Sequence, residues 1–438
     1  MKKMRKKNKI LLIIALVIAA VSCKKEEYIF DQSPDERLNE TLAGYQAALT
    51  SSPAGWKAVL QPALGGAYNF FFQFNNDNRV FMFADIDTAT AHTKRESSYR
   101  LKALQQPSLI FDTYSYLHIL ADPDGSKNGG INGVGLASDF EFAFQSASED
   151  SIVLIGRQNK TKLKLEKATQ EELDAWQNGT WLNILNFLNI QKIEHYFKRL
   201  SLGGATYEIE VDPVSRLIKF QWISGGSLQT LTTGYFLNSQ GLMLETPVVN
   251  GSQTIDRLAG FSWNNVTKTL QLTAAGTTGN ITGATAPLRA DTQAPRRWWQ
   301  EGVTQDSYWY SRNGFRSSSS PDLFNMRSLN RYYYLVYWPV YGENGENDLF
   351  GPVFINSAED GLELLYGAAP DIPTFTADGR IVFDNLGFYG PYPSTGPAYQ
   401  SLQQLLIPEG YYLVQTASGY DMVSAADART WISWVPTW

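Results

Sequence analysis

The sequence predicts a mainly β protein (β with minor α) of two repeated antiparallel barrel- or sandwich-like units. An N-terminal helix, a helical connector and an aromatic-rich C-terminal region complete it. Apolar residues alternate with a period of two from residue 56 to 167, which is typical of strands with two different faces. A second stretch, 206–273, resembles a shortened copy of the first. Tyrosine and tryptophan then gather after residue 294.

The start of the chain has the pattern of a secretory signal. Six basic residues precede Ile10, and residues 10–20 are wholly apolar but too few to span a bilayer as a stable helix. Ala20-Val21-Ser22 then precedes Cys23, the only cysteine of the chain. This order resembles the bacterial lipoprotein signal and predicts cleavage before Cys23 and lipidation of Cys23, which would anchor the protein to the outer membrane. The alternative is an ordinary signal peptide with an incidental cysteine.

Composition excludes some partners. Removal of residues 1–22 deletes six basic and no acidic residues, so the formal net charge moves from −6 to −12. A net acidic protein is a poor candidate for binding nucleic acid or anionic lipid headgroups. With one cysteine there is no disulfide framework, so stability must come from packed cores.

Two capping boxes indicate where helices begin. Ser33 with Glu36 predicts a helix from residue 33 to about 50, which we expect to pack on the first β unit. Thr169 with Glu172 opens a helical connector that reaches about residue 200, interrupted at Gly179. The predicted parts are a signal peptide (1–22), a tether (23–32), the helix plus first β unit (33–168), the connector plus second β unit (169–275) and the aromatic-rich region (276–438).

The two β units share three short patterns in the same order. Strands of the first unit are expected within 70–83, 98–104, 109–120, 140–145, 151–155 and 162–166. Residues 74–80 match 211–217, with Arg79 opposite Arg216, while 109–113 match 242–246 and 142–144 match 261–263. Three matches in one order predict an internal repeat. The Gly-, Thr- and Ala-rich stretch 274–294 is expected to be a loop.

No pattern for catalysis, metal binding or a cofactor stands out, so we predict none of them. The three histidines are isolated, and we expect His118 to be half-exposed on a strand. Residues 122–126 resemble the start of a calcium loop but lack its bidentate glutamate. Asp85 and Asp87 could pair for acid/base chemistry, although acidic residues at strand ends are common on solvated loops.

The aromatic region is the predicted binding surface. Thirteen of the 44 residues from 298 to 341 are aromatic, and Trp and Tyr suit exposed recognition surfaces. We expect exposed, ligand-binding rings among Trp298, Trp299, Tyr308 and Trp309, because adjacent tryptophans on an extended strand face opposite sides. The alternative is that these rings fill a β core.

Five segments carry a family resemblance: 29–38 (IFDQSPDERL), 55–57 (GWK), 96–102 (ESSYRLK), 106–116 (QPSLIFDTYSY) and 138–142 (SDFEF). They resemble a Bacteroidetes lipoprotein family, the domain of unknown function 4302, from about residue 23 to 170 and more loosely to 275. The resemblance implies a partner of outer-membrane TonB-linked uptake systems and brings no catalytic residues with it. Lys24-Lys25-Glu26-Glu27 resembles the charged tag that sends lipoproteins of this phylum to the cell surface.

The sequence therefore predicts a cell-surface outer-membrane lipoprotein that binds a nutrient without enzymatic activity. Its expected partners are a TonB-dependent transporter and that transporter's binding lipoprotein, and its ligand is a glycan, a peptide or haem. Two alternatives stay open: a carboxylate-dependent surface glycoside hydrolase and a structural subunit of a surface complex. A cleft with two carboxylates at reacting distance would favour the enzyme, whereas an exposed aromatic platform would favour capture.

Overall fold

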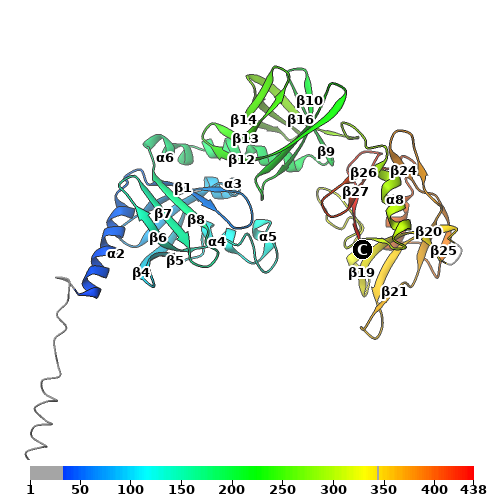
Figure 1. The fold of residues 1–438 in the computed structure, drawn as a ribbon, viewed down its shortest axis with the longest axis horizontal. Helices are drawn as coiled ribbons and strands as arrows, with labels where there is room; N and C mark the ends of the chain where they lie inside the picture. Colours follow the sequence, from blue (N-terminus) through cyan, green and yellow to red (C-terminus); the bar gives the residue numbers. More distant parts are fainter. Residues whose placement is uncertain (1–32, 343–344) are drawn as a thin grey trace, which may run out of the picture.

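In the computed structural model, which describes residues 33–342 and 345–438, the chain forms two closed barrels followed by an open sheet (Figure 1). The three β units follow one another along the molecule, from blue and cyan through green to yellow and red (Figure 1). The predicted mainly β fold is confirmed. Cys23, the signal peptide and the tether lie outside the described residues. In the described part, no helix has the length and apolarity needed to cross a bilayer.

Helix α2 (Pro34–Thr50) begins at the predicted capping box. Ser33 Oγ accepts a hydrogen bond from the Glu36 amide, and the Ser33 amide donates to Glu36 Oε2 at 2.8 Å. The helix packs on the first barrel as expected: the Tyr45 ring stacks on Phe144 with centroids 3.8 Å apart. Trp56 Nε1 of the barrel donates to the Leu49 carbonyl at 2.7 Å, which fixes the end of the helix.

The first barrel is closed by pairing between its first and last strands. Side chains alternate as the period of two predicts, so Phe70 and Phe72 enter the barrel core while Phe71 points out of it. The strands are β1 (Trp56–Gln61), β2 (Tyr68–Phe74), β3 (Arg79–Ala84), β4 (Arg95–Ala103), β5 (Pro107–Phe111), β6 (Glu141–Ala147), β7 (Ser151–Gly156) and β8 (Lys162–Lys167).

Three short helices interrupt this barrel, and one of them corrects the sequence analysis. They are α3 (Thr88–His92), α4 (Tyr116–Ala121) and α5 (Gly125–Asn128). The strand expected over 109–120 is wrong, because β5 ends at Phe111 and α4 follows. The Ser115 amide donates to His118 Nδ1 at 3.1 Å, which starts the helix and buries His118 rather than half-exposing it on a strand.

The connector is helical as predicted. It comprises α6 (Gln170–Gln177), α7 (Thr180–Leu185) and the 3-10 helix η1 (Asn186–Lys192), with Thr169 and Glu172 forming the capping box of α6. Helix α7 and η1 pack on the second barrel, where the Phe187 ring meets Tyr235 edge-on at 5.8 Å between centroids. The helical region ends earlier than expected, at Lys192.

The second barrel also has eight strands and closes by pairing of β9 with β16. Its last strand lies inside the stretch that we expected to be a loop, so the predicted boundary at residue 275 falls within the barrel. The strands are β9 (Phe197–Leu202), β10 (Ala205–Asp212), β11 (Leu217–Ser224), β12 (Ser227–Asn238), β13 (Gly241–Asn250), β14 (Gln253–Asn264), β15 (Thr269–Ala274) and β16 (Thr277–Ala284).

The predicted repeat is confirmed at the level of strand order. Each of the three matched patterns falls at the same position in its barrel: β2–β3 and β10–β11, β5 and β13, β6 and β14. The turns differ by one residue, so Arg216 corresponds to Asn78 rather than to Arg79. Both have positive φ (56° and 57°), and both carbonyls accept a 2.9 Å bond from a buried tyrosine amide, Tyr235 and Tyr99.

The C-terminal unit is a 12-stranded sheet with helices on its core face. Helices α8 (Ala294–Thr304) and α9 (Gly396–Leu405) pack on that face together, and η2 is a 3-10 turn (Met326–Ser328). The strands are β17 (Trp309–Ser311), β18 (Phe315–Arg316), β19 (Tyr332–Tyr341), β20 (Asn347–Ile355), β21 (Leu362–Glu363), β22 (Gly367–Pro370), β23 (Thr374–Phe375), β24 (Arg380–Val382), β25 (Asn385–Tyr389), β26 (Tyr411–Gln415), β27 (Tyr420–Ser424) and β28 (Trp431–Pro436).

The turn between β10 and β11 joins the two barrels. Val214 packs against the core of the first barrel, and its carbonyl accepts from the Gly66 amide at 3.0 Å. Arg216 Nη2 lies 3.0 Å from Asp85 Oδ1 and also donates to the Asp85 carbonyl at 2.9 Å. Both side chains are almost fully buried. A Cβ at Gly66 would lie 2.0 Å from Arg216 Cγ, so only glycine leaves room there.

Neighbouring side chains contact both members of this ion pair, while Nε and Nη1 of Arg216 are enclosed without a hydrogen-bond acceptor among the described residues. Asp85 accepts from the Asn69 amide at 2.9 Å and from Asn69 Nδ2 at 2.7 Å. The guanidinium carbon lies 4.5 Å from the centroid of the Tyr68 ring and 5.8 Å from that of Tyr235. A desolvated guanidinium between two rings gains cation–π attraction, so the barrels are joined by one buried, charge-neutral cluster.

Replacing Arg216 tests whether this cluster stabilises the contact between the barrels. Arg216→Met keeps an apolar stem but leaves Asp85 charged and buried, and we expect the free energy of unfolding to fall by about 3–5 kcal/mol. Denaturant unfolding measures the loss, and Asp85→Asn added to Arg216→Met should recover part of it because the buried charge is gone.

The matched control is Arg79→Met, at the position that the sequence alone pairs with Arg216. Arg79 is half-exposed and faces Glu96 at 3.4 Å, so its loss should cost less than about 1 kcal/mol. Equal losses for the two variants would show that Arg216 makes no special contribution.

Candidate functional site

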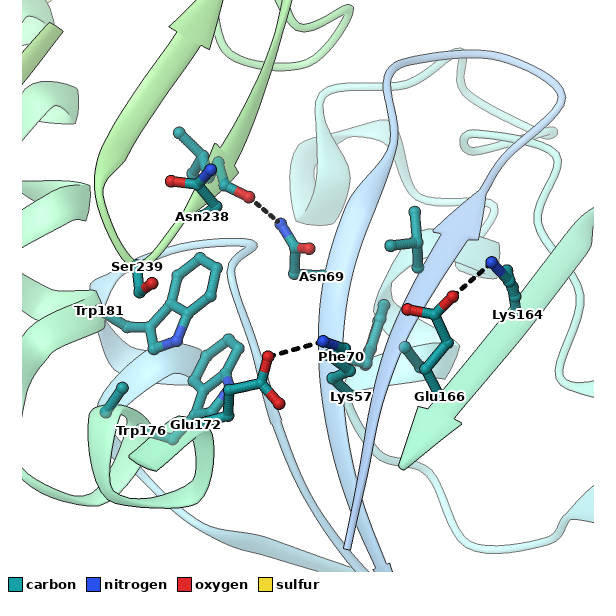
Figure 2. A pocket seen from close by; sticks show the side chains of 14 residues that line it. Lys57, Asn69, Phe70, Lys164, Glu166, Glu172, Trp176, Trp181, Asn238 and Ser239 are labelled. Atoms are coloured by element: carbon teal, nitrogen blue, oxygen red, sulfur yellow. Dashed lines mark hydrogen bonds and ion pairs between the residues drawn. The ribbon is translucent and has the colours of Figure 1, made fainter. Parts of the chain in front are cut away.

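A cleft of about 280 Å³ lies between the two barrels and the connector (Figure 2). Its floor is the outer surface of β1, β2 and β8 of the first barrel. Helices α6 and α7 form one wall, and the turn that joins β12 to β13 overhangs it. Three units of the chain therefore contribute to one cavity, and its shape depends on the contact between the barrels.

Two stacked tryptophans form the aromatic wall. Trp176 and Trp181 lie with centroids 4.2 Å apart and planes 14° apart, and the Phe83 ring supports Trp176 from the first barrel at 5.9 Å. Both are buried except at the edges that line the cleft. Within the described residues neither indole N–H donates a hydrogen bond.

Polar side chains opposite this wall are held in place by hydrogen bonds, and each keeps an atom that can form a further hydrogen bond. Asn69 Nδ2 donates to Asp85 Oδ2 and, at 3.0 Å, to the Leu237 carbonyl, which fixes the side chain and leaves Oδ1 as an acceptor (Figure 2). Asn238 Oδ1 accepts from the Gln240 amide at 2.9 Å, which leaves its Nδ2 as a donor. Ser239 is exposed at the rim of the cleft.

The charged groups of the cleft are paired. Lys57 Nζ donates to Glu172 Oε1 at 2.7 Å, and Glu172 Oε2 accepts from the Thr169 amide at 2.9 Å. Lys164 pairs with Glu166 (Figure 2). The hydrogen bond from Lys164 holds the pKa of Glu166 below its usual range, and the charge of Lys57 adds to this. Glu166 is therefore ionised at neutral pH and is not a proton donor.

Trp298 and Trp309 are not among the exposed rings that we expected within this set of four, because both are core residues of the C-terminal unit. Trp298 is 0% exposed and Trp309 1% exposed, and Trp309 Nε1 donates to the Trp298 carbonyl at 3.0 Å. Trp298 and Trp299 lie on helix α8 and not on the extended strand that we expected. The alternative of rings that fill a β core holds for these two.

Trp299 and Tyr308 are partly exposed but do not form one surface. Trp299 Nε1 donates to Asp348 Oδ2 at 2.8 Å on the helix-covered face of the sheet. The Tyr308 hydroxyl is 2.8 Å from that of Tyr334 and lines a shallow hollow of about 170 Å³ with Trp338 and Tyr341. Ligand binding by either residue stays a prediction.

The carboxylates singled out in the sequence have structural partners. Asp85 pairs with Arg216, and Asp87 caps α3 by accepting from the Thr90 amide at 2.7 Å, so the two do not form an acid/base pair. Asp122 accepts from Tyr114 and from the Asp124 amide, as in a tight turn. Across the described residues no three His, Cys, Asp or Glu side chains gather as a metal site would require.

Trp176 and Trp181 were not expected from the sequence as site residues. The available signal was their position on either side of Gly179, where a positive φ of 84° turns the chain so that successive helices can bring the two rings together. Nothing local shows that their edges meet a cavity, because its other walls come from β2 and from the turn after β12.

The chain belongs to the family described as domain of unknown function DUF4302, which matches residues 26–265. The match covers the first barrel, the connector and most of the second barrel, and leaves the C-terminal sheet outside. No curated protein matches the chain.

One solved structure with a match is that of the octameric penicillin-binding protein homologue from Pyrococcus abyssi, at 13% identity. The match covers 34% of this chain and 36% of that one, so the chain spans about a third of that protein's length. The TM-score is 0.16.

Asp348, which accepts a hydrogen bond from Trp299, makes the stability of the C-terminal unit depend on pH. Burial raises the pKa of Asp348 to about 6, although Tyr337, Val340 and Trp299 all donate to it. Because the folded pKa exceeds the unfolded one, the folded state binds an extra proton between about pH 4 and 6. The free energy of unfolding should therefore fall by on the order of 2–3 kcal/mol as pH rises through that window.

Asp348→Asn cannot take up this proton, so it isolates the effect from all other titrating groups. The stability advantage of the wild type over the variant should be larger at pH 4 than at pH 7 in denaturant unfolding. A difference that does not change with pH would contradict the raised pKa.

Proposed function

We propose that the protein is a lipoprotein of the outer membrane, anchored through acylated Cys23 and exposed on the cell surface. It binds a nutrient in the cleft between its barrels, without converting it, and hands it to a TonB-dependent transporter and that transporter's binding lipoprotein. The basic and apolar start of the chain and the position of its single cysteine support the anchor. The cleft supports the binding role.

The observation that carries the proposal is the combination of free donors and acceptors with a stacked aromatic wall. Asn69 Oδ1, Asn238 Nδ2 and two indole N–H groups are fixed in place but make no other hydrogen bond among the described residues. Sites for small molecules are mostly apolar, with a few convergent polar groups of this kind. Groups that are already in position lose little entropy on binding, which favours affinity.

The electrostatics of the cleft favour binding over glycoside hydrolysis. A glycosidase needs one protonated carboxylic acid and one ionised carboxylate beside the scissile bond. Glu166 is held ionised by Lys164, and both oxygens of Glu172 are occupied by Lys57 and the helix cap. Neither group is arranged to donate a proton to a leaving group.

The size and chemistry of the cleft favour a glycan end over haem. About 280 Å³ is at the low end for small-molecule sites, and no His, Met, Cys or Tyr lines it that could ligate iron. Indole rings beside amide and hydroxyl groups match a sugar, which has an apolar ring face and hydroxyls that both donate and accept. A neutral saccharide also suits walls whose own charges are already paired.

The anchor is tested by replacing the cysteine. Cys23→Ala should abolish labelling of the protein by a radioactive fatty acid and release it from the membrane fraction, because no other thiol can be acylated. Lys25→Ala, two residues further on, should label as the wild type does. Labelling of Cys23→Ala would exclude the lipoprotein signal, and full protection from protease added to whole cells would exclude surface exposure.

The cleft is tested by a binding panel. We expect the purified protein to bind a member of a glycan panel, and Trp181→Ala to weaken that binding by about one to two decades, the loss of one stacked ring. Calorimetric titration measures the affinity, and the melting temperature shows whether the variant is folded.

Trp438→Ala is the matched control, since Trp438 is a tryptophan with 45% exposure that does not line the cleft. It should bind as the wild type does. Selective binding of peptides instead of glycans would change the ligand class, and equal binding by wild type and a folded Trp181→Ala would move the site away from this cleft.

A further inference from the structure

A second polar cavity lies between the second barrel and the C-terminal sheet. Its volume is about 340 Å³, and its walls come from β9, β10 and β11 on one side and from β18, β27 and β28 on the other. The two units are in direct contact beside it: the Tyr196 amide donates to the Ala428 carbonyl at 2.7 Å, and Phe197 packs with Val423. The cavity is therefore a built part of the molecule, away from the cleft between the barrels.

The carboxylates of this cavity all have partners. Glu208 Oε2 accepts from the Leu288 amide at 2.7 Å and pairs with Arg199 at 3.2 Å. Glu210 pairs with Lys219 at 2.9 Å. Asp421 Oδ2 accepts from the Tyr196 hydroxyl at 2.8 Å. Burial raises the pKa of Glu208, while the Leu288 amide and the charge of Arg199 lower it. A further negative charge is therefore disfavoured at the end of the cavity where Glu208 lies.

Two cations in the same cavity lack such partners. Lys198 Nζ donates only to the carbonyl of His195, at 3.3 Å, and no carboxylate among the described residues lies within 4.0 Å of it. Burial lowers the pKa of Lys198, with Glu210 opposing from farther away. The Arg316 guanidinium makes no hydrogen bond or ion pair in the described part of the chain, and its Nε is fully enclosed.

Arg316 is nevertheless held in place. Its guanidinium carbon lies 5.5 Å from the centroid of the Trp431 ring, which stacks beneath it and lines the same cavity. A desolvated cation without a counter-charge is costly, and an anion bound beside it offsets that cost. Arg316 comes from the sheet and Lys198 from the barrel, so an anion between them would be held by both units.

We propose that this cavity binds the carboxylate group of a small ligand, which Arg316 and Lys198 recognise across the junction of the second barrel and the C-terminal sheet. The planar fork of a guanidinium matches the two oxygens of a carboxylate, and Lys198 adds a point charge. A singly charged carboxylate fits better than a phosphate or sulfate, because Asp421 and Glu208 in the same cavity repel a doubly charged group more strongly. The proposal does not depend on the cleft between the barrels.

The test compares acids with neutral counterparts by calorimetric titration of the full-length protein. Galacturonate is compared with galactose, and alanyl-alanine with its C-terminal amide, so the two pairs distinguish a sugar acid from a peptide carboxylate. At least one acid should bind, its neutral counterpart should bind at least about tenfold more weakly, and the affinity should fall with added salt. If neither acid binds at concentrations up to about 10 mM, or if each acid binds no better than its counterpart, the proposal is overturned.

Substitutions of Arg316 and Lys198 test whether these two cations bind the acid. Arg316→Met and Lys198→Met keep the apolar stems, and each should weaken binding of the acid at least about tenfold. Arg312→Met, an exposed arginine on the same segment that does not line the cavity, changes the net charge equally and should bind as the wild type does.

The melting temperature without ligand separates a binding role from a structural one. Arg316→Met should melt no lower than the wild type, because it removes an enclosed donor that has no acceptor. If Arg316→Met and Lys198→Met both bind the acid as tightly as the wild type, or if Arg316→Met melts well below it and loses binding only with its fold, the cations do not form this site.

Discussion

The buried ion pair between Arg216 and Asp85 is the contact on which the arrangement of the two barrels depends. Apolar contacts surround it. Val214 of the second barrel packs on the core of the first, while Phe71 and Phe83 of the first barrel join the cluster that runs through the connector into the second. Because a buried pair loses much if one partner withdraws, the barrels are held at one distance and angle. The cleft beside the pair is therefore formed before any ligand arrives.

The repeat places an equivalent turn in both barrels, but the turn has a different role in each. In the first barrel the residue with positive φ is Asn78, which suits that conformation and lies in an exposed turn. In the second barrel the same position is Arg216, whose side chain enters the first barrel, and Gly66 supplies the space for it. Both barrels keep the same strand order, and the Arg216 side chain in the turn of the second barrel joins that barrel to the first. Asn69 links the joint to the cleft, because its amide group contacts both Asp85 and Leu237.

Features that depend on neighbours in the sequence could be predicted. Both capping boxes form as expected, and the period of two located most strands of the first barrel because one face of each is buried. Features that depend on distant residues could not. Whether Trp298 is exposed depends on packing with Trp434 and Tyr337, and whether Trp176 lines a cavity depends on the second barrel. The role of Arg216 was hidden for the same reason, since Asp85 lies 131 residues away.

The most direct test of the account is the distance between the barrels in solution without ligand. Replacing Cys23 by Ala leaves no native cysteine, so spin labels can be attached to Glu149→Cys on the first barrel and Val266→Cys on the second, both highly exposed. Pulsed electron resonance should give one narrow distance distribution, which broadens when Arg216→Met is added. A broad distribution with Arg216 intact would mean that the barrels move independently and that the cleft is not a preformed site.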